Sequence, residues 1–287
     1  SIFVHTNETI PYTWLCEKFI DMNIPFYFNG KSTSGKSFLM DNVLDKKAAE
    51  DLDILKIKVV SSYYTNSNDV ENYIFSCLST IKRDEFGDKN LKNTLLFIDD
   101  LNMKKQKDEY GSSTLFEFLR ELIENKYIYD TKNSEVRYLK KFNMCCCGNL
   151  TAYPDQDEFN RFLTKYLIMT FVTTDDYYLN IFKPSLEFHF RQFIPNTSGI
   201  TATQYLQASL KLNNILKNDI QQEPKKLHCQ INIKDMMKVV QSFHDFKFRG
   251  TSDYPEYLKK IFFYESSIAY ESKLNKKEDI ELFKEKI

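Results

Sequence analysis

Short apolar runs alternate with amphipathic segments in the first part of the chain. The apolar runs have the length of strands and predict five of them, at Pro25–Gly30, Ile54–Val60, Asn93–Asp100, Lys140–Cys147 and Tyr166–Val172. The segments between them carry apolar residues at helical spacing and predict helices at Tyr12–Met22, Lys36–Leu44, Asp69–Arg83 and Ser113–Lys126. This alternation is typical of an α/β domain with a parallel five-stranded sheet flanked by helices.

The pattern changes from about Asp175 onward. Amphipathic segments joined by polar stretches predict helices at residues 175–193, 201–218, 232–246 and 254–274, and no segment there has the pattern of a strand. The charged segment 273–286 predicts a solvated helix that leads into a further part of a parent chain. We therefore expect an α/β domain at residues 1–174 and a smaller, all-helical lid at residues 175–287.

Composition excludes several classes of partner. Hydrophobic residues make up 42% of the 287 residues, enough to bury a core, while 39 Lys and Arg nearly balance 40 Asp and Glu. No basic excess points to nucleic acid, and no apolar run approaches the roughly 20 residues that span a bilayer. We therefore expect neither a nucleic-acid nor a membrane partner. The lack of a starting Met indicates a piece of a longer protein.

The six cysteines have the spacing of neither a disulfide framework nor a zinc site. Their usage indicates a reducing compartment, and hence the cytoplasm. Cys145, Cys146 and Cys147 are adjacent, which raises the alternative of redox chemistry, but successive strand residues point to opposite faces. We interpret them as small side chains filling a buried strand. His189, His228 and His244 do not have the spacing of metal ligands, and we expect them to be packing or surface residues.

A phosphate-binding loop follows the first predicted strand. The run GKSTSGKS satisfies the pattern G-x-x-x-x-G-K-[ST], in which two glycines let the backbone N–H groups turn toward phosphate oxygens. Lys36 would reach the terminal phosphates, the Ser37 hydroxyl would bind Mg²⁺, and the following helix would direct its positive end at the anion. The alternative is a Gly/Ser turn with an incidental lysine. The predicted nucleotide-binding set here is Gly30, Lys31, Ser32, Thr33, Ser34, Gly35, Lys36, Ser37 and Phe38.

Two carboxylates follow the third predicted strand. The run LLFIDDLNM ends an apolar strand in Asp99 and Asp100, beside the loop if the sheet is parallel. Asp99 would be the second Mg²⁺ partner, and Asp100 stands where a longer glutamate would normally polarise the attacking water. Because aspartate is one methylene shorter, we expect weak activation of water. The alternative is that these aspartates cap the next helix.

The segments GKSTSGKS, FIDDLNM, YGSSTLFEFLRELIENKYIYD, RFLTKY and LKKIFFYESSIAYESKL together resemble an AAA+ module of a dynein heavy chain. The similarity is greatest to the third module of the motor ring, of the axonemal type, and covers nearly the whole chain. The phosphate-binding loop is shared with many unrelated ATPases, whereas D-D-L-N-M, the Y-G…L-R stretch and the Y-x-Y-D that follows are more specific.

The resemblance implies further site residues. Val4 and Thr6 match the family's adenine-proximal stretch, and Asn149 matches a sensor asparagine that contacts the attacking water or the γ-phosphate. Lys234 falls where the family tends to carry a sensor arginine, and Arg161 matches an arginine directed at the neighbouring module's nucleotide. The alternative is a solvated lysine for Lys234 and, for Arg161, an ion pair with a nearby acid.

Departures from the family pattern concern hydrolysis more than binding. The loop Asn149–Phe159 replaces a Gly/Pro-rich one, Lys104 replaces a proline, Thr164 replaces a second arginine, and Lys234 replaces the sensor arginine. The expected function is therefore a module that binds ATP or ADP with Mg²⁺, hydrolyses weakly when isolated, and transmits conformational change in microtubule-based movement.

The resemblance also implies partners and a location. They are neighbouring modules of the same heavy chain, microtubules through other parts of it, and dynein intermediate and light chains, in the cytoskeleton of a cilium or flagellum axoneme. Two alternatives stay open. One is a structural or regulatory module that holds its nucleotide without hydrolysis. The other is a stand-alone P-loop enzyme, such as a nucleotide kinase, for which no arginine cluster near the phosphates is evident.

Overall fold

The computed structural model describes residues 3–50, 54–90, 92–103, 114–130, 135–149, 162–192, 198–220, 231–245 and 254–286. Contacts divide the chain into two compact units. The first comprises residues 1–3 and 7–172, and the second comprises residues 4–6 and 173–287. The assignment of nucleotide binding to residues 1–174 and of a lid to residues 175–287 stays a prediction.

The first unit is built on a five-stranded parallel sheet of order β2-β5-β8-β1-β9. Its strands are β1 (Phe26–Gly30), β2 (Ile54–Val60), β5 (Asn93–Asp99), β8 (Phe142–Gly148) and β9 (Leu167–Phe171). Each falls within two residues of a predicted strand, so the predicted parallel sheet is confirmed. Because β1, β5 and β8 are central and neighbouring, their carboxyl ends bring the phosphate-binding loop, Asp99 and Asn149 to one edge.

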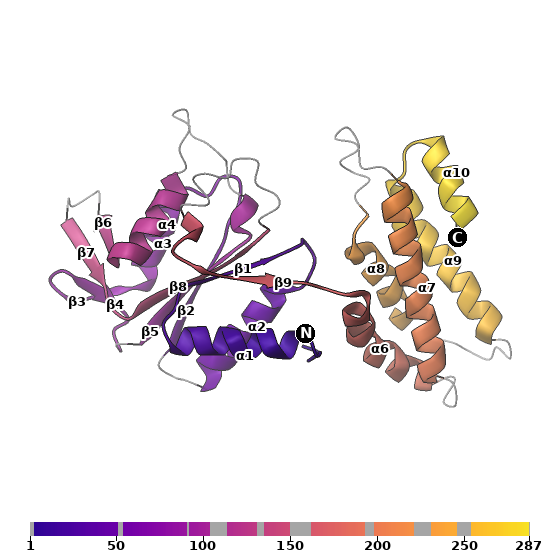
Figure 1. The fold of residues 1–287 in the computed structure, drawn as a ribbon, viewed down its shortest axis with the longest axis horizontal. Helices are drawn as coiled ribbons and strands as arrows, with labels where there is room; N and C mark the ends of the chain where they lie inside the picture. The colour runs from indigo at the N-terminus through magenta and orange to yellow at the C-terminus, as the bar shows by residue number, and fades with distance from the viewer. Residues whose placement is uncertain are drawn as a thin grey trace. The chain divides into compact units, whose positions relative to one another are not determined.

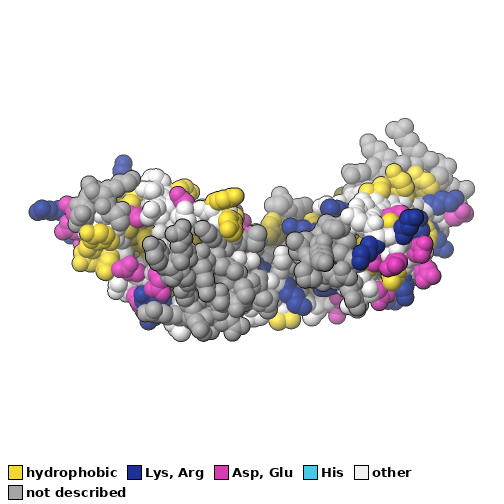
Figure 2. All heavy atoms as spheres, turned by 90° about the horizontal axis from the view of Figure 1, so that it is seen from above, with side chains coloured by type: hydrophobic (Ala, Val, Ile, Leu, Met, Phe, Trp, Pro, Cys, Tyr) yellow, Lys and Arg dark blue, Asp and Glu magenta, His cyan; other side chains and the backbone are white. Residues whose placement is uncertain are grey.

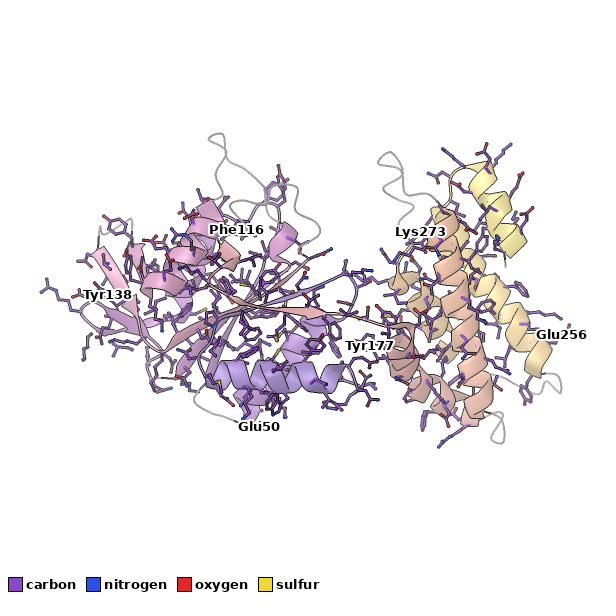
Figure 3. All side chains as sticks on the ribbon, in the orientation of Figure 1. Glu50, Phe116, Tyr138, Tyr177, Glu256 and Lys273 are labelled. Carbon is purple, nitrogen blue, oxygen red and sulfur yellow. The ribbon has the colours of Figure 1, made fainter. Side chains whose placement is uncertain are left out.

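Helices cover both faces of this sheet (Figure 1). On one face lie α1 (Thr9–Asp21) and α2 (Lys36–Glu50), and on the other lie α3 (Ser67–Cys77) and α4 (Thr114–Asn125). Phe116 on α4, labelled in Figure 3, stacks on Phe162 with ring centroids 5.2 Å apart. Phe116 is buried in the core beneath α4, while Phe118 is partly buried against the same core.

A second, four-stranded sheet lies in the same unit and was not predicted. Its order is β3-β4-β7-β6, with β3 (Ser79–Lys82), β4 (Glu85–Gly87), β6 (Tyr127–Asp130) and β7 (Glu135–Leu139). The predicted helix Asp69–Arg83 is wrong beyond Cys77, because α3 ends there and residues 79–82 pair with β4. Tyr138, labelled in Figure 3, lies on β7 opposite Tyr127 of β6.

The three adjacent cysteines lie on the central strand β8 and are buried. Cys146 belongs to the core that α3 and α4 cover, whereas Cys145 and Cys147 point to the face of α1 and α2. Burial raises the pKa of Cys146 to about 12 and that of Cys145 and Cys147 well above the ordinary value. Packing therefore accounts for these side chains. Within the described residues, no group of His, Cys, Asp and Glu could hold a metal ion by itself.

The regular elements that the structure describes in the second unit are all helices. Its elements are α6 (Asp175–Arg191), α7 (Ser198–Asp219), α8 (Ile233–Asp245), α9 (Tyr254–Tyr270), the short η4 (Glu271–Lys273) and α10 (Lys277–Lys286). They enclose a core of their own that includes Phe190, Tyr205 and Phe243. The prediction of a solvated helix at 273–286 is wrong in one respect, because Phe283 of α10 is fully buried in this core.

The surface of the second unit carries charges of both signs. On the face shown in Figure 2, Lys and Arg side chains lie among those of Asp and Glu. Several of them pair, such as Lys260 with Glu256 at 2.8 Å. None of the described helices combines the length and hydropathy required to cross a membrane.

Candidate nucleotide-binding site

The phosphate-binding loop connects β1 to the first turn of α2. Its backbone turns through Thr33 at φ 68° and Gly35 at φ 94°, in the left-handed region that glycine adopts without strain. At Gly30 a Cβ atom would lie 3.0 Å from the Phe171 carbonyl oxygen and 3.1 Å from the Lys36 side chain. The loop therefore needs its first glycine for close packing and its second for backbone conformation.

Lys36 is held inside its own loop. Its ammonium donates to the carbonyl oxygens of Gly30 at 2.7 Å and Lys31 at 2.8 Å, and lies 3.4 Å from the Ser34 hydroxyl. Burial lowers the pKa of Lys36, and the nearby Cys147, Asp100 and Asp99 act in the opposite direction. A buried cation among carbonyl dipoles and next to a helix N-terminus is a favourable partner for a phosphate group.

Ser37 and Asp99 meet across the sheet edge. The Ser37 hydroxyl donates to Asp99 Oδ1 at 2.7 Å, which leaves the lone pairs of the hydroxyl oxygen available to a cation. Burial raises the pKa of Asp99, the Ser37 hydrogen bond lowers it, and the charge of Asp100 raises it. A hydroxyl and a carboxylate are hard oxygen ligands, which fit Mg²⁺ held jointly by a few protein groups and nucleotide phosphates.

The residues predicted to act on water follow β5 and β8. Asp100 is exposed, has φ 51°, and donates its N–H to Asp99 Oδ1 at 3.0 Å. Asn149 is partly buried just after β8, and its N–H donates to Asn102 Oδ1 at 3.3 Å. The structure thus brings Asp99, Asp100 and Asn149 to the same edge of the sheet. Their catalytic roles stay predictions.

Asn102, in the run D-D-L-N-M, is a residue of this site that the sequence alone did not predict. It lies in η1 (Leu101–Met103), three residues after Asp99, and receives the Asn149 N–H. A Cβ atom on Gly148 would lie 3.2 Å from Asn102 Oδ1 and 2.2 Å from the Tyr27 hydroxyl. Asn102 therefore connects the end of β5 to the end of β8. Its position in the same short run as Asp99 could have indicated that it belongs to the site.

Phe3, near the N-terminus, lies beside the start of α2. The Phe3 ring lies 5.6 Å from the ring of Phe38, which is exposed on the first turn of that helix. Val4 is partly buried and Thr6 is 4% exposed. The contact with Phe38 places Phe3 alone beside the start of α2, while adenine binding by Val4 and Thr6 stays a prediction.

Two predicted residues are not brought to this site by the described contacts. Lys234 is exposed on the first turn of α8, in the second unit. Arg161 lies outside the described residues, as do Lys104 and most of the loop Asn149–Phe159. Thr164, which replaces a second family arginine, is exposed in the turn after residue 163.

Comparison with known proteins gives one family and several relatives. The family of the P-loop containing dynein motor region matches residues 1–174. "Dynein heavy chain-like protein 2" of Plasmodium falciparum is 24% identical over 283 residues, 96% of this chain and 5% of the relative. Dynein axonemal heavy chain 10 of Homo sapiens is 25% identical over 242 residues, covering 83% of this chain and 5% of the relative.

A further relative agrees with these. Dynein axonemal heavy chain 12 of Mus musculus is 26% identical over 243 residues, covering 83% of this chain and 8% of the relative. The chain therefore spans less than a tenth of the length of these relatives. The family match agrees with the loop, the Ser37–Asp99 contact and the parallel sheet described above. The chain belongs to the family of P-loop-containing dynein motor regions, AAA+ modules homologous to part of the axonemal dynein heavy chains.

Proposed function

We propose that this chain is a Mg²⁺–nucleotide-binding module of a dynein motor ring, most similar to the third module of an axonemal heavy chain. The observation that carries the proposal is the joint placement of Lys36, Ser37 and Asp99. The loop holds the ammonium, and the hydroxyl lies 2.7 Å from the carboxylate at the end of β5. These are the groups that a triphosphate and its cation require.

Each residue has a defined task in this proposal. Backbone N–H groups of Ser32–Ser37 and the Lys36 ammonium bind phosphate oxygens, while Ser37 and Asp99 hold the cation. Mg²⁺, when bound, neutralises negative charge on the phosphates. Asp100 accepts a proton from the attacking water, Asn149 orients that water, and Val4, Thr6 and Phe38 lie on the adenine side.

Hydrolysis by the isolated chain is expected to be slow. Asp100 has a shorter side chain than glutamate, and its backbone is in the left-handed region. Completion of the site would need an arginine from an adjacent module. Arg161 of this chain would in the same way complete the site of the next module. Lys234 would act as a sensor of the nucleotide in the helical lid. Closure of the α/β part against the lid and neighbour would pass rigid-body motion around the ring.

The wider assignments follow from the relatives. We propose neighbouring AAA+ modules, microtubules contacted through other parts of the heavy chain, and dynein intermediate and light chains as partners. The proposed location is the axoneme of a cilium or flagellum. A second candidate function, a regulatory module that keeps its nucleotide without hydrolysing it, is favoured by the short, exposed Asp100 carboxylate.

Analysis of nucleotide in the purified chain tests the proposal. We expect adenosine nucleotide to be released on denaturation, and slow phosphate release when ATP is added. Lys36→Ala should remove both, whereas Lys46→Ala, on the outer side of the same helix, should retain both. Tightly held ADP without turnover would favour the regulatory candidate. Fast turnover by the isolated chain would contradict its dependence on a neighbour.

A further inference from the structure

Helix α2 is joined to the edge strand β2 by charged side chains. The Lys58 ammonium lies 2.5 Å from Asp41 Oδ2, and the Lys56 ammonium lies 3.1 Å from Asp41 Oδ1 and 2.7 Å from Asp45 Oδ1. Lys56 and Lys58 are two residues apart on a strand, so both point to the face that α2 covers. Asp41 thus receives two ammonium groups from one strand.

These ion pairs continue the contact between Ser37 and Asp99. Ser37, Asp41 and Asp45 are spaced by four residues and therefore lie along one side of α2. On the sheet, Val60 is in register with Asp99 and Lys58 with Phe97. The Lys58 ammonium lies 5.4 Å from the centroid of the buried Phe97 ring, two residues before Asp99 on the same strand.

We call this series of contacts the α2 ladder. It consists of Ser37, Asp41 and Asp45 on the helix and of Asp99, Lys58 and Lys56 on the sheet. Its first rung is the candidate Mg²⁺ site, and its second rung is one helical turn away. The sequence alone did not predict the α2 ladder, because its members lie on three separate segments, α2, β2 and β5.

The ladder differs in kind from the apolar contacts of α2. Leu39, Met40, Val43 and Leu44 are buried, but apolar packing is non-directional and tolerates small rotations of a helix. The hydrogen bond that the Lys58 ammonium donates to Asp41 needs a short, aligned contact, and the Asp41 and Lys58 side chains are each only 31% exposed. A partly buried charge that loses its partner costs free energy, so this pair resists rotation of α2.

We propose that Asp41 and Lys58 are positioning residues for Ser37. They fix the rotation of α2 about its axis, and this rotation sets the direction in which the Ser37 hydroxyl presents its lone pairs. Neither residue touches the nucleotide or the cation. The inference rests on the proposed function, because it concerns the affinity of the same site for Mg²⁺–nucleotide.

The expected signature is a selective loss of the Mg²⁺ effect. The affinity of the purified chain for fluorescent ADP is measured with Mg²⁺ and with EDTA, and the ratio of the two dissociation constants gives the Mg²⁺ effect. We expect Asp41→Asn and Lys58→Met each to reduce this ratio by about tenfold, as loss of outer-shell support does at metal sites. Affinity in EDTA should stay close to that of the wild type.

A matched control uses another ion pair of the same helix. Glu17→Gln removes the pair between Lys46 and Glu17, 3.0 Å apart, which joins α2 to α1 rather than to the sheet. This variant should keep the Mg²⁺ ratio. Lys58→Arg keeps a cation beside Asp41 and, unlike an exchange of the two charges, places no second ammonium next to Lys56, so it should keep most of the ratio. This conservative variant also decides the question if Lys58→Met unfolds the chain.

Two results would overturn the proposal. One is an equal loss of affinity with and without Mg²⁺, which indicates general destabilisation of the loop. The other is a ratio in the Asp41 and Lys58 variants that matches the Glu17→Gln control. Failure of the proposed function is distinguishable, because then the wild type binds no nucleotide, or Lys36→Ala binds it as well as the wild type.

Discussion

The Ser37 hydroxyl and the Asp99 carboxylate lie 2.7 Å apart although 62 residues separate them in the sequence. The contact requires β5 to lie inside the sheet, between β2 and β8, with α2 packed against the face to which Asp99 points. It connects the phosphate-binding loop to the carboxyl end of β5, where Asp99 lies. The proposed Mg²⁺ site depends on this one relationship more than on any other.

Asp99→Asn tests the charge in that contact. Asparagine can still accept the Ser37 hydrogen bond, so the loop should keep its shape while one negative charge is lost. We expect the Mg²⁺-dependent part of ADP affinity to fall by about tenfold or more, a loss of about 1.4 kcal/mol or more. Binding in EDTA should be retained or strengthened. Titration of fluorescent ADP measures both, and an unchanged Mg²⁺ effect would contradict the assignment of Asp99.

Gly148→Ala tests the packing at the end of β8. The added Cβ would lie 2.2 Å from the Tyr27 hydroxyl, so the strand end or the ring must move. We expect a loss of about 1–3 kcal/mol in the free energy of unfolding, as in other overpacked cores. Tyr27→Phe removes that hydroxyl, and the double variant should regain most of the loss in urea titrations. Equal instability of the single and double variants would show that another contact is responsible.

Lys273→Met tests the ion pair inside the second unit. Lys273, labelled in Figure 3, places its ammonium 2.6 Å from Oδ1 and 2.7 Å from Oδ2 of Asp235, whose side chain is 2% exposed. Without the lysine a buried carboxylate loses its nearer cation and keeps only Lys238 at 3.9 Å, so we expect a loss of about 3 kcal/mol in the free energy of unfolding. Lys260→Met breaks the exposed pair with Glu256 and is the control. Equal losses in the free energy of unfolding for both variants would contradict the predicted difference between the buried and the exposed ion pair.

Burial of the thiols predicts which cysteines react with an alkylating reagent between about pH 7 and pH 9. The thiolate is the reactive form, and burial raises the pKa of Cys16 and Cys146 to about 12. Because these pKa values lie above the range of about pH 7–9, the thiols stay protonated there as well as shielded. Cys77 is exposed. Iodoacetamide should therefore label Cys77 in the folded chain, and peptide mass mapping should show Cys16 and Cys146 unmodified.

The control for this pattern is the same reaction in denaturant. All these cysteines should then react, since unfolding removes both the shielding and the shift in pKa. Labelling of Cys146 in the folded chain at the rate of Cys77 would mean that β8 is not buried as described.

The sequence predicted well whatever depends on local pattern. The apolar runs before Gly30 and Asp99 predict strands and correspond to β1 and β5. The loop at residues 30–37 was evident because its chemistry is encoded in one short spacing. The contact of Ser37 with Asp99 followed from strand adjacency, which parallel α/β topology restricts to few arrangements.

The rest depends on distant partners. β4 is three residues long and pairs with β7, about 50 positions later, so neither segment shows a strand pattern of its own. Likewise, the three apolar residues Ile280, Leu282 and Phe283 among the charged residues of α10 were too few to predict that it would be anchored in a core. The pairing of Asp41 with Lys58 is of the same kind, since only the fold brings α2 over β2.

The central claim is tested most directly by calorimetric titration of the purified chain, stripped of any nucleotide it carries, with Mg²⁺–ADP, for the wild type and for Lys36→Ala. The account predicts saturable binding with one site per chain for the wild type and none for Lys36→Ala, whose thermal unfolding without nucleotide should match that of the wild type. Absence of binding in the folded wild type, or undiminished binding in Lys36→Ala, would contradict the account.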